Sequence, residues 1–91
     1  MDKNAQGAEH RRDDVTVEVF APRQAEPRKF TWELTKLVGD AAREAAKAFG
    51  YEGGDPTLGH GEKIFKRDET LAAAHVHDGE KLELLDVGGG V

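Results

Sequence analysis

The sequence lacks cysteine and serine altogether, and its 91 residues include one tryptophan, one tyrosine and one methionine. Without cysteine there can be no disulfide, thiolate metal site or cysteine nucleophile, and without serine the commonest hydroxyl nucleophile is missing as well. No apolar run approaches the roughly 18 residues that a membrane-spanning helix needs. We therefore expect neither an enzyme nor a resident cofactor or metal.

Basic residues are also few: the sequence has 13 of them and 18 acidic residues, so the formal net charge is −5. A nucleic-acid-binding domain needs a basic face, so nucleic acid is not an expected partner, and no membrane partner is expected either. The first 14 residues are polar and lack the apolar segment of a secretion signal. The sequence thus predicts one small cytoplasmic domain.

Apolar patterning divides the first half of the chain into three parts. Residues 1–14 carry too few apolar side chains to offset the entropy of ordering them, which predicts a disordered N-terminal arm. From Val15, valines at every second position indicate a half-buried strand. Phe30, Trp32 and Leu34 repeat this alternation after a turn that contains two prolines, so the two runs predict a β-hairpin.

A change of period then indicates a helix whose buried face is rich in alanine. Thr35 is expected to cap its first turn, and Gly50 to end it in the left-handed conformation. Gly39 lowers the helix propensity, and a close approach of the helix to the sheet would offset that cost. The predicted buried stripe comprises Val38, Ala41, Ala42, Ala45 and Phe49.

Shorter elements are predicted in the second half. Residues 51–62 are expected to form a glycine-rich loop, and residues 63–66 a short strand. Residues 70–76 indicate a turn or short helix with Leu71 and Val76 pointing inward, and Asp78-Gly79 indicates a tight turn before a last strand over 82–87. Two strands, a helix, a strand, a turn and a final strand predict an α+β domain with one helix packed across one face of a mixed sheet.

The last 22 residues, TLAAAHVHDGEKLELLDVGGGV, resemble the C-terminal part of the ubiquitin-like family. Its Thr-Leu pair, apolar residue, polar turn, apolar strand and Gly-Gly tail follow in that order. The elements upstream are similar to the β-grasp fold of the same family, and the resemblance covers residues 15–91. The segments VGDAAREAAKAFG and DGEKLELLDVGGGV look most like bacterial ubiquitin-like proteins that are encoded beside E1-like, E2-like and JAB-type peptidase proteins.

This resemblance implies a β-grasp domain over residues 15–87 and a flexible tail over 88–91. It also implies a protein modifier, which an E1-like enzyme activates and an E2-like enzyme passes to amines of target proteins as isopeptide bonds. Gly89 and Gly90 would form the conjugation terminus, because glycine leaves the acyl carbon unhindered. Since the family's active form ends in glycine, a JAB-type metallopeptidase is expected to remove Val91.

Two alternatives to the modifier stay open. Sulfur-carrier proteins share the fold and a Gly-Gly terminus, which they convert to a thiocarboxylate. A binding module with the same fold would use its surface alone and would not be conjugated. Val91 and the polar residues 1–14 favour the modifier, because the carriers end at Gly-Gly and lack a long arm.

Two pairs of consecutive apolar residues predict a docking surface. Neighbours on a strand face opposite sides, so one member of Ile64-Phe65 and one of Leu84-Leu85 must point away from the core. With Leu82 and Leu84 facing the core, we expect Leu85 and Val87 to be exposed. The candidate partner-binding patch is Ile64, Phe65, Leu85 and Val87, and the resemblance implies the same sheet face.

Three histidines are candidate metal ligands. His75 and His77 would share one side of a strand and could bind one ion there, with His60 as a third ligand if its loop folds back. Solvated turn residues are the preferred interpretation, so no metal site is predicted.

Overall fold

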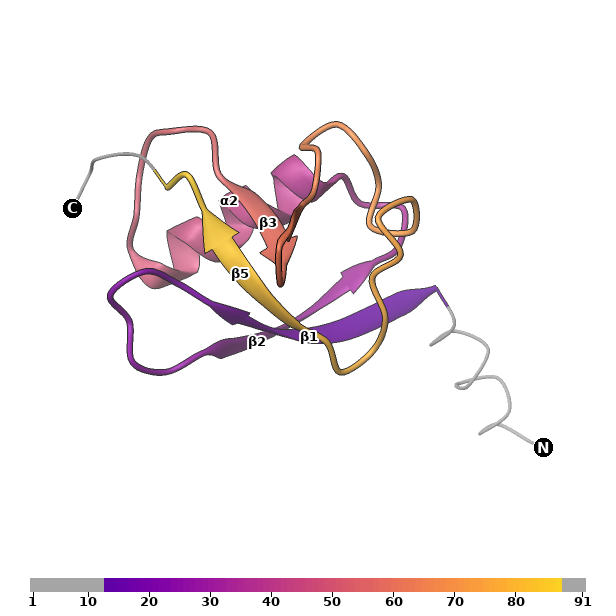
Figure 1. Cartoon of the computed structure of the whole chain (residues 1–91), viewed down its shortest axis with the longest axis horizontal. Coiled ribbons are helices and arrows are strands. Elements are labelled where there is room, and N and C mark those ends of the chain that lie inside the picture. The colour runs from indigo at the N-terminus through magenta and orange to yellow at the C-terminus, as the bar shows by residue number, and fades with distance from the viewer. Residues whose placement is uncertain (1–12, 88–91) are drawn as a thin grey trace.

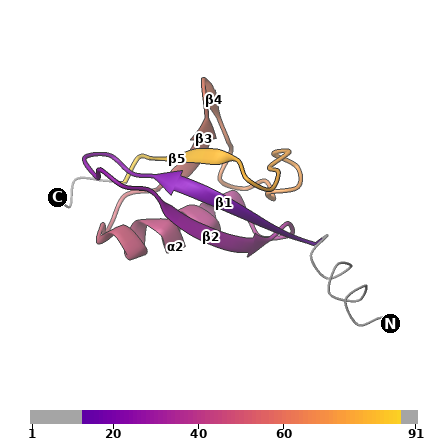
Figure 2. The same cartoon turned by 90° about the horizontal axis from the view of Figure 1, so that it is seen from below.

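The computed structural model describes residues 13–87, which form a five-stranded mixed sheet and one α-helix (Figure 1). The order across the sheet is β2-β1-β5-β3-β4, in which β1 and β5 are parallel and all other neighbours are antiparallel. This confirms the predicted α+β class, with the helix on one side of the sheet (Figure 2). The elements are β1 (Asp14–Phe20), β2 (Arg28–Glu33), α2 (Val38–Phe49), β3 (Thr57–His60), β4 (Lys63–Ile64) and β5 (Lys81–Leu85).

The predicted hairpin of β1 and β2 is confirmed. Its valines at positions 15, 17 and 19 are buried, and across from Val15 lies Trp32, which is buried as well. Phe30 lies opposite Val17 and is half-buried. The alternation thus produces the expected result, one face against the core and one face toward solvent.

Helix α2 ends as predicted but begins differently. Gly50 takes the left-handed conformation (φ 94°), and its N–H bonds the carbonyls of Ala46 and Lys47. At the other end the N-cap is Leu37, not Thr35, and no side chain caps it. Backbone carbonyls of a distant loop replace the cap, because the N–H of Val38 donates to Glu69 (2.8 Å) and that of Gly39 donates to Arg67 (2.9 Å).

The same loop explains the glycine in the first turn of the helix. A Cβ at Gly39 would lie 3.0 Å from the Arg67 guanidinium carbon and 3.1 Å from the Arg67 carbonyl oxygen. Arg67 is held there by donating from Nε to the carbonyl of Pro56 (2.8 Å). The close approach therefore exists, but it is to this loop and not to the sheet.

The predicted loop over residues 51–62 is wrong in its second half, where β3 lies. Thr57, Leu58 and Gly59 are buried between β5 and β4. The segment Thr-Leu-Gly-His carries a single large apolar side chain and a glycine, so no alternation marks it as a strand. Strand β3 forms because it pairs with β4 and β5, and the local sequence of β3 carries no sign of that pairing.

The turns before β5 agree with the prediction. Leu71 and Val76 are buried, and residues 71–75 form a turn. At the predicted Asp78-Gly79 turn, the Thr16 N–H donates to Asp78 Oδ1 and the Gly79 N–H donates to the Thr16 carbonyl, each at 2.7 Å. These two bonds tie the turn to β1 and set the start of β5 beside it.

Two predictions lie partly or wholly outside the described residues. The predicted arm over 1–14 falls there except for Asp13 and Asp14, and Asp14 already belongs to β1. The predicted tail over 88–91 falls there entirely. Within residues 13–87, no helix is both long and apolar enough to cross a membrane.

Candidate functional site

The candidate site lies on the face of the sheet that turns away from α2. Four residues from four strands gather there: Phe20 of β1, Leu85 of β5, Gly59 of β3 and Ile64 of β4. We call this set the Leu85 surface. Ile64 is 65% exposed, while Phe20 and Leu85 are half-exposed.

Strand register brings these residues together. Phe20 lies across from Glu83, Glu83 lies across from Gly59, and Gly59 lies across from Ile64, so one row crosses the outer face. A Cβ at Gly59 would come within 3.0 Å of Leu85 Cδ1 and 2.9 Å of the Lys63 carbonyl oxygen. Because Gly59 has no side chain, Leu85 can lie across β3 toward β4. Leu85 and Ile64 thus form a short apolar strip across β3, and Glu83 separates this strip from Phe20 in the row.

The structure narrows the predicted patch to two of its four members. Ile64 and Leu85 face outward, whereas Phe65 and Val87 are 4% and 6% exposed. Phe65 follows β4, and its N–H donates to the Leu58 carbonyl (2.9 Å), which turns its ring into the core. One member of the Ile64-Phe65 pair thus faces outward as expected, so Phe65 leaves the predicted patch, and the outward placement of Val87 is wrong.

Val87 is buried because strand alternation stops at Asp86. That residue has a left-handed φ of 57°, so the chain turns and returns Val87 to the core side. Alternation alone would have kept Val87 on the face of Leu85. Aspartate is among the non-glycine residues that adopt this conformation most readily.

Phe20 and Gly59 were missed at the level of sequence. The signal for Phe20 was present, because the alternation of β1 continues one step past Val19 and makes Phe20 an outward residue. Gly59 could not be recognised, because its role depends on the unpredicted strand β3.

The chain leaves the core next to this surface. Strand β5 points to the same end of the molecule as the loop between β1 and β2 and the loop between α2 and β3 (Figure 1). These two loops are joined by the Tyr51 hydroxyl, which donates to the Pro22 carbonyl. Val87 is the last described residue, and the predicted terminus of Gly89, Gly90 and Val91 lies outside the described residues.

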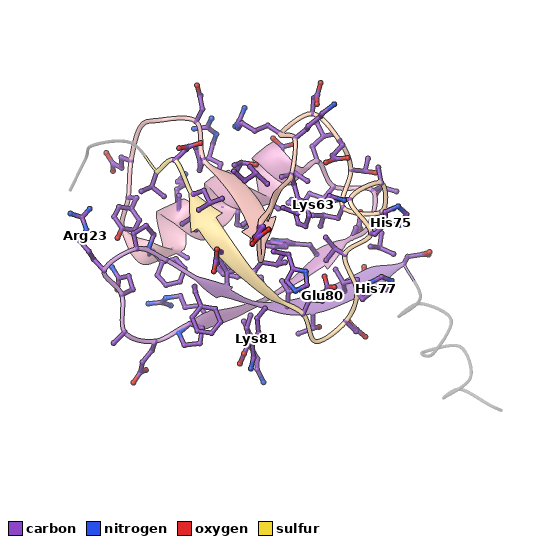
Figure 3. The ribbon with its side chains drawn as sticks, in the orientation of Figure 1. Arg23, Lys63, His75, His77, Glu80 and Lys81 are labelled. Atoms are coloured by element: carbon purple, nitrogen blue, oxygen red, sulfur yellow. The ribbon has the colours of Figure 1, made fainter. Side chains whose placement is uncertain are left out.

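The histidines are not arranged as a strand pair. His75 has a left-handed φ of 62° within the turn, and both His75 and His77 are exposed. His77 instead lies beside Glu80, with its Nδ1 atom 3.7 Å from Glu80 Oε2 (Figure 3). The Nδ1 atom of His60 lies 4.0 Å from the same oxygen. No group of three or more metal-ligating side chains is found within residues 13–87.

Solved structures provide the comparison, since no protein-family model and no curated protein matches this chain. Ubiquitin from Caldiarchaeum subterraneum superposes with a TM-score of 0.72 at 18% identity, covering 86% of this chain and 99% of that one. An N-terminal ubiquitin-like domain gives 0.70 at 15% identity, covering 87% and 80%. A chain of a toluene 4-monooxygenase HD complex gives 0.69 at 14%, covering 78% and 95%.

The sequence identities to these structures are all below 20%, so the comparison supports a shared fold and not a shared activity. The matches span four fifths or more of each matched chain, including an entire ubiquitin. The likeness is therefore one of overall fold across most of each chain. The chain has the ubiquitin-like β-grasp fold.

Proposed function

We propose that this chain is a protein modifier that is conjugated through the carboxylate of Gly90. The observation that carries the proposal is the junction at Val87, the last core side chain within residues 13–87, which three glycines follow at once in the sequence. Any reaction at Gly90 therefore takes place three residues from a firmly buried anchor. A glycine backbone admits close approach by an enzyme's channel walls, because no Cβ intervenes.

The chemistry requires activation of a carboxylate by a partner enzyme. An E1-like enzyme would join the Gly90 carboxylate to the α-phosphate of ATP with loss of pyrophosphate. A cysteine thiolate of that enzyme would then displace AMP and form a thioester. After transfer to an E2-like enzyme, an amine of a target protein would displace the thiol and leave an isopeptide bond.

Val91 must be removed before that sequence can start. Its branched side chain crowds the acyl carbon, so a channel shaped for glycine would exclude it. A JAB-type metallopeptidase is the proposed enzyme, which would hydrolyse the Gly90–Val91 bond with a metal-activated water. The requirement is only that the bond after Gly90 be cut.

The Leu85 surface is the proposed recognition face for these enzymes. Part of it, Leu85, lies on β5, the strand that leads to the glycines. An enzyme that binds Ile64 and Leu85 would therefore also be positioned to receive the tail. An exposed apolar strip bordered by charged residues is typical of a protein-docking site.

Three proteins test the proposal with an E1-like enzyme from the same cells: the full chain, a chain truncated after Gly90, and the truncated chain carrying Gly90→Ala. We expect the truncated chain to form an ATP-dependent thioester directly. The full chain should do so only after treatment with the peptidase, and Gly90→Ala should react poorly. Thioester formation by a chain that still carries Val91 would contradict the precursor step.

Intact mass of the activated product separates the two alternatives. A sulfur carrier would exchange one carboxylate oxygen for sulfur and yield no conjugates. A binding module would remain unchanged in mass with every E1-like enzyme and sulfur donor supplied. Either result would replace the modifier proposal.

A further inference from the structure

Strand β2 forms one edge of the sheet and is the longer of its two edge strands. It spans Arg28–Glu33 and pairs with β1 on one side, and no strand within residues 13–87 pairs with its other side. The opposite edge is β4, which has two residues. A six-residue edge presents a row of backbone donors and acceptors that a further strand can use.

The register identifies which backbone groups of β2 point outward. The Leu34 N–H donates to the Asp13 carbonyl (2.7 Å), so position 34 and every second residue before it bond toward β1. The alternate residues Lys29, Thr31 and Glu33 therefore direct N–H and C=O away from the sheet. Their side chains are exposed on the outer face.

We propose that this edge pairs antiparallel with β2 of a second copy of the chain, centred on Thr31. In that register Thr31 lies opposite its own counterpart, Lys29 lies opposite Glu33 of the other copy, and Glu33 lies opposite the other copy's Lys29. All three outward-pointing residues fall on hydrogen-bonded pairs, so each copy donates three N–H groups and accepts three. A twofold arrangement of this kind uses the same surface on both copies.

Charge selects this register over its neighbours. A pairing centred on position 29 would place two lysines face to face, and one centred on position 33 would do the same with two glutamates. Glu33 also lies directly across from Asp14 in its own hairpin, a pair of like charges that is unfavourable within a sheet. The partner's lysine brings an opposite charge to that side of Glu33.

The other side of β2 adds an aromatic contact. The rings of Phe30 and Trp32 are stacked, with centroids 4.9 Å apart and planes at 12°. In the proposed register each Phe30 lies across from the Trp32 of the other copy, and because Trp32 is buried in its own chain, Phe30 is the ring that can reach the contact. Helix α2 packs chiefly against β3 and β5, and Phe30 is only half-buried in the single chain. Cross-strand aromatic pairs stabilise antiparallel pairing.

The paired edge also sets a limit to the assembly. Once the two β2 strands meet, the remaining edges are the two-residue β4 strands, which are too short to continue the sheet. A closed dimer is expected, not a filament. Pairing of one short strand buries less area than a permanent interface needs, so the dimer is expected to be reversible and weaker at high salt.

Sedimentation of the full chain over a concentration series is the first test. We expect a monomer–dimer equilibrium, together with slowed amide exchange at positions 29, 31 and 33 as concentration rises. Lys29→Glu and Glu33→Lys should each weaken dimerisation by about tenfold or more, because both salt-bridge positions then hold like charges. All substituted positions are exposed, so the fold should be retained.

Mixing the two variants is the decisive step. The Lys29→Glu chain has glutamate at both positions, and the Glu33→Lys chain has lysine at both. In a mixed dimer every glutamate therefore lies opposite a lysine, so an equimolar mixture should recover dimers that neither variant forms alone. Monomers at about 1 mM, or dimers that are indifferent to both substitutions, would overturn the proposal. So would protection of positions 29, 31 and 33 that appears only when an extended peptide from another protein is added. None of these outcomes depends on conjugation through Gly90.

Discussion

At the scale of single residues, Leu84 and Leu85 are adjacent in sequence and opposite in role. Leu84 is 1% exposed in the core, whereas Leu85 lies across Gly59 on the outer face. One is a packing residue and the other belongs to the proposed recognition surface. Their contrast allows stability and binding to be separated with the same truncation.

Leu85→Ala should weaken partner binding while lowering the free energy of unfolding by no more than about 1 kcal/mol, because Leu85 is only half-buried. Leu84→Ala removes a fully buried side chain and should cost about 2–5 kcal/mol. Urea unfolding gives both values, and thioester formation with an E1-like enzyme reports binding. A Leu85→Ala chain that is destabilised as much as Leu84→Ala would assign Leu85 to the core.

Asp86 controls how the chain leaves the domain. Its left-handed backbone returns Val87 to the core, one residue before the glycines. Asp86→Val places a branched side chain where φ is positive and should lower stability by about 1–2 kcal/mol. Asp86→Gly is the matched control and should leave stability nearly unchanged, since glycine adopts this conformation freely. Equal urea midpoints for both variants would show that the turn at Asp86 is not required.

At the scale of elements, local pattern predicted those parts of the fold that depend on local sequence. The valines of β1, the aromatic residues of β2 and the alanine stripe of α2 each repeat with the period of their element, and each has the expected burial. Gly50 ends the helix for a local reason, its positive φ. These predictions are confirmed because hydrophobic period and backbone freedom act over a few residues.

Elements that depend on distant partners were mispredicted. Strand β3 exists through its pairing with β5 and β4, and the start of α2 is completed by carbonyls of Arg67 and Glu69 instead of a side chain at Thr35. For the candidate site, Ile64 and Leu85 followed from alternation. Val87 did not, because one positive φ at Asp86 reverses its side.

Gly39 provides a test of the contact between helix and loop. Glycine normally costs a helix about 1 kcal/mol relative to alanine, so Ala48→Gly at an exposed helical position should destabilise by that amount. Gly39→Ala should also destabilise, by about 1 kcal/mol or more, because its Cβ would press on the carbonyl and guanidinium of Arg67. Thermal or urea unfolding measures both. A Gly39→Ala chain that is more stable than the wild type would contradict the close approach.

At the scale of the whole molecule, the two proposed surfaces occupy different regions of one sheet. The Leu85 surface crosses β1, β5, β3 and β4, and the proposed pairing edge is the far side of β2. Because β1 lies between β2 and β5, pairing at β2 leaves β5 outside the dimer contact. The proposed dimer therefore leaves the Leu85 surface of each copy open, and the proposed conjugation would not require dissociation.

Conjugation through Gly90 is the central claim, and its covalent trace is the most direct test. No lysine or arginine follows Lys81 before Gly90, so trypsin would cut after Lys81 and leave residues 82–90, LELLDVGGG, attached to the modified lysine of a target. The measurement is mass spectrometry of tryptic digests from cells that produce the chain, with a Gly90→Ala strain as the control. We expect tryptic peptides in which a target lysine carries this remnant, and we expect these modified peptides to be absent from the control. Digests in which the segment occurs only as a free peptide, under conditions where the chain is abundant, would contradict the claim.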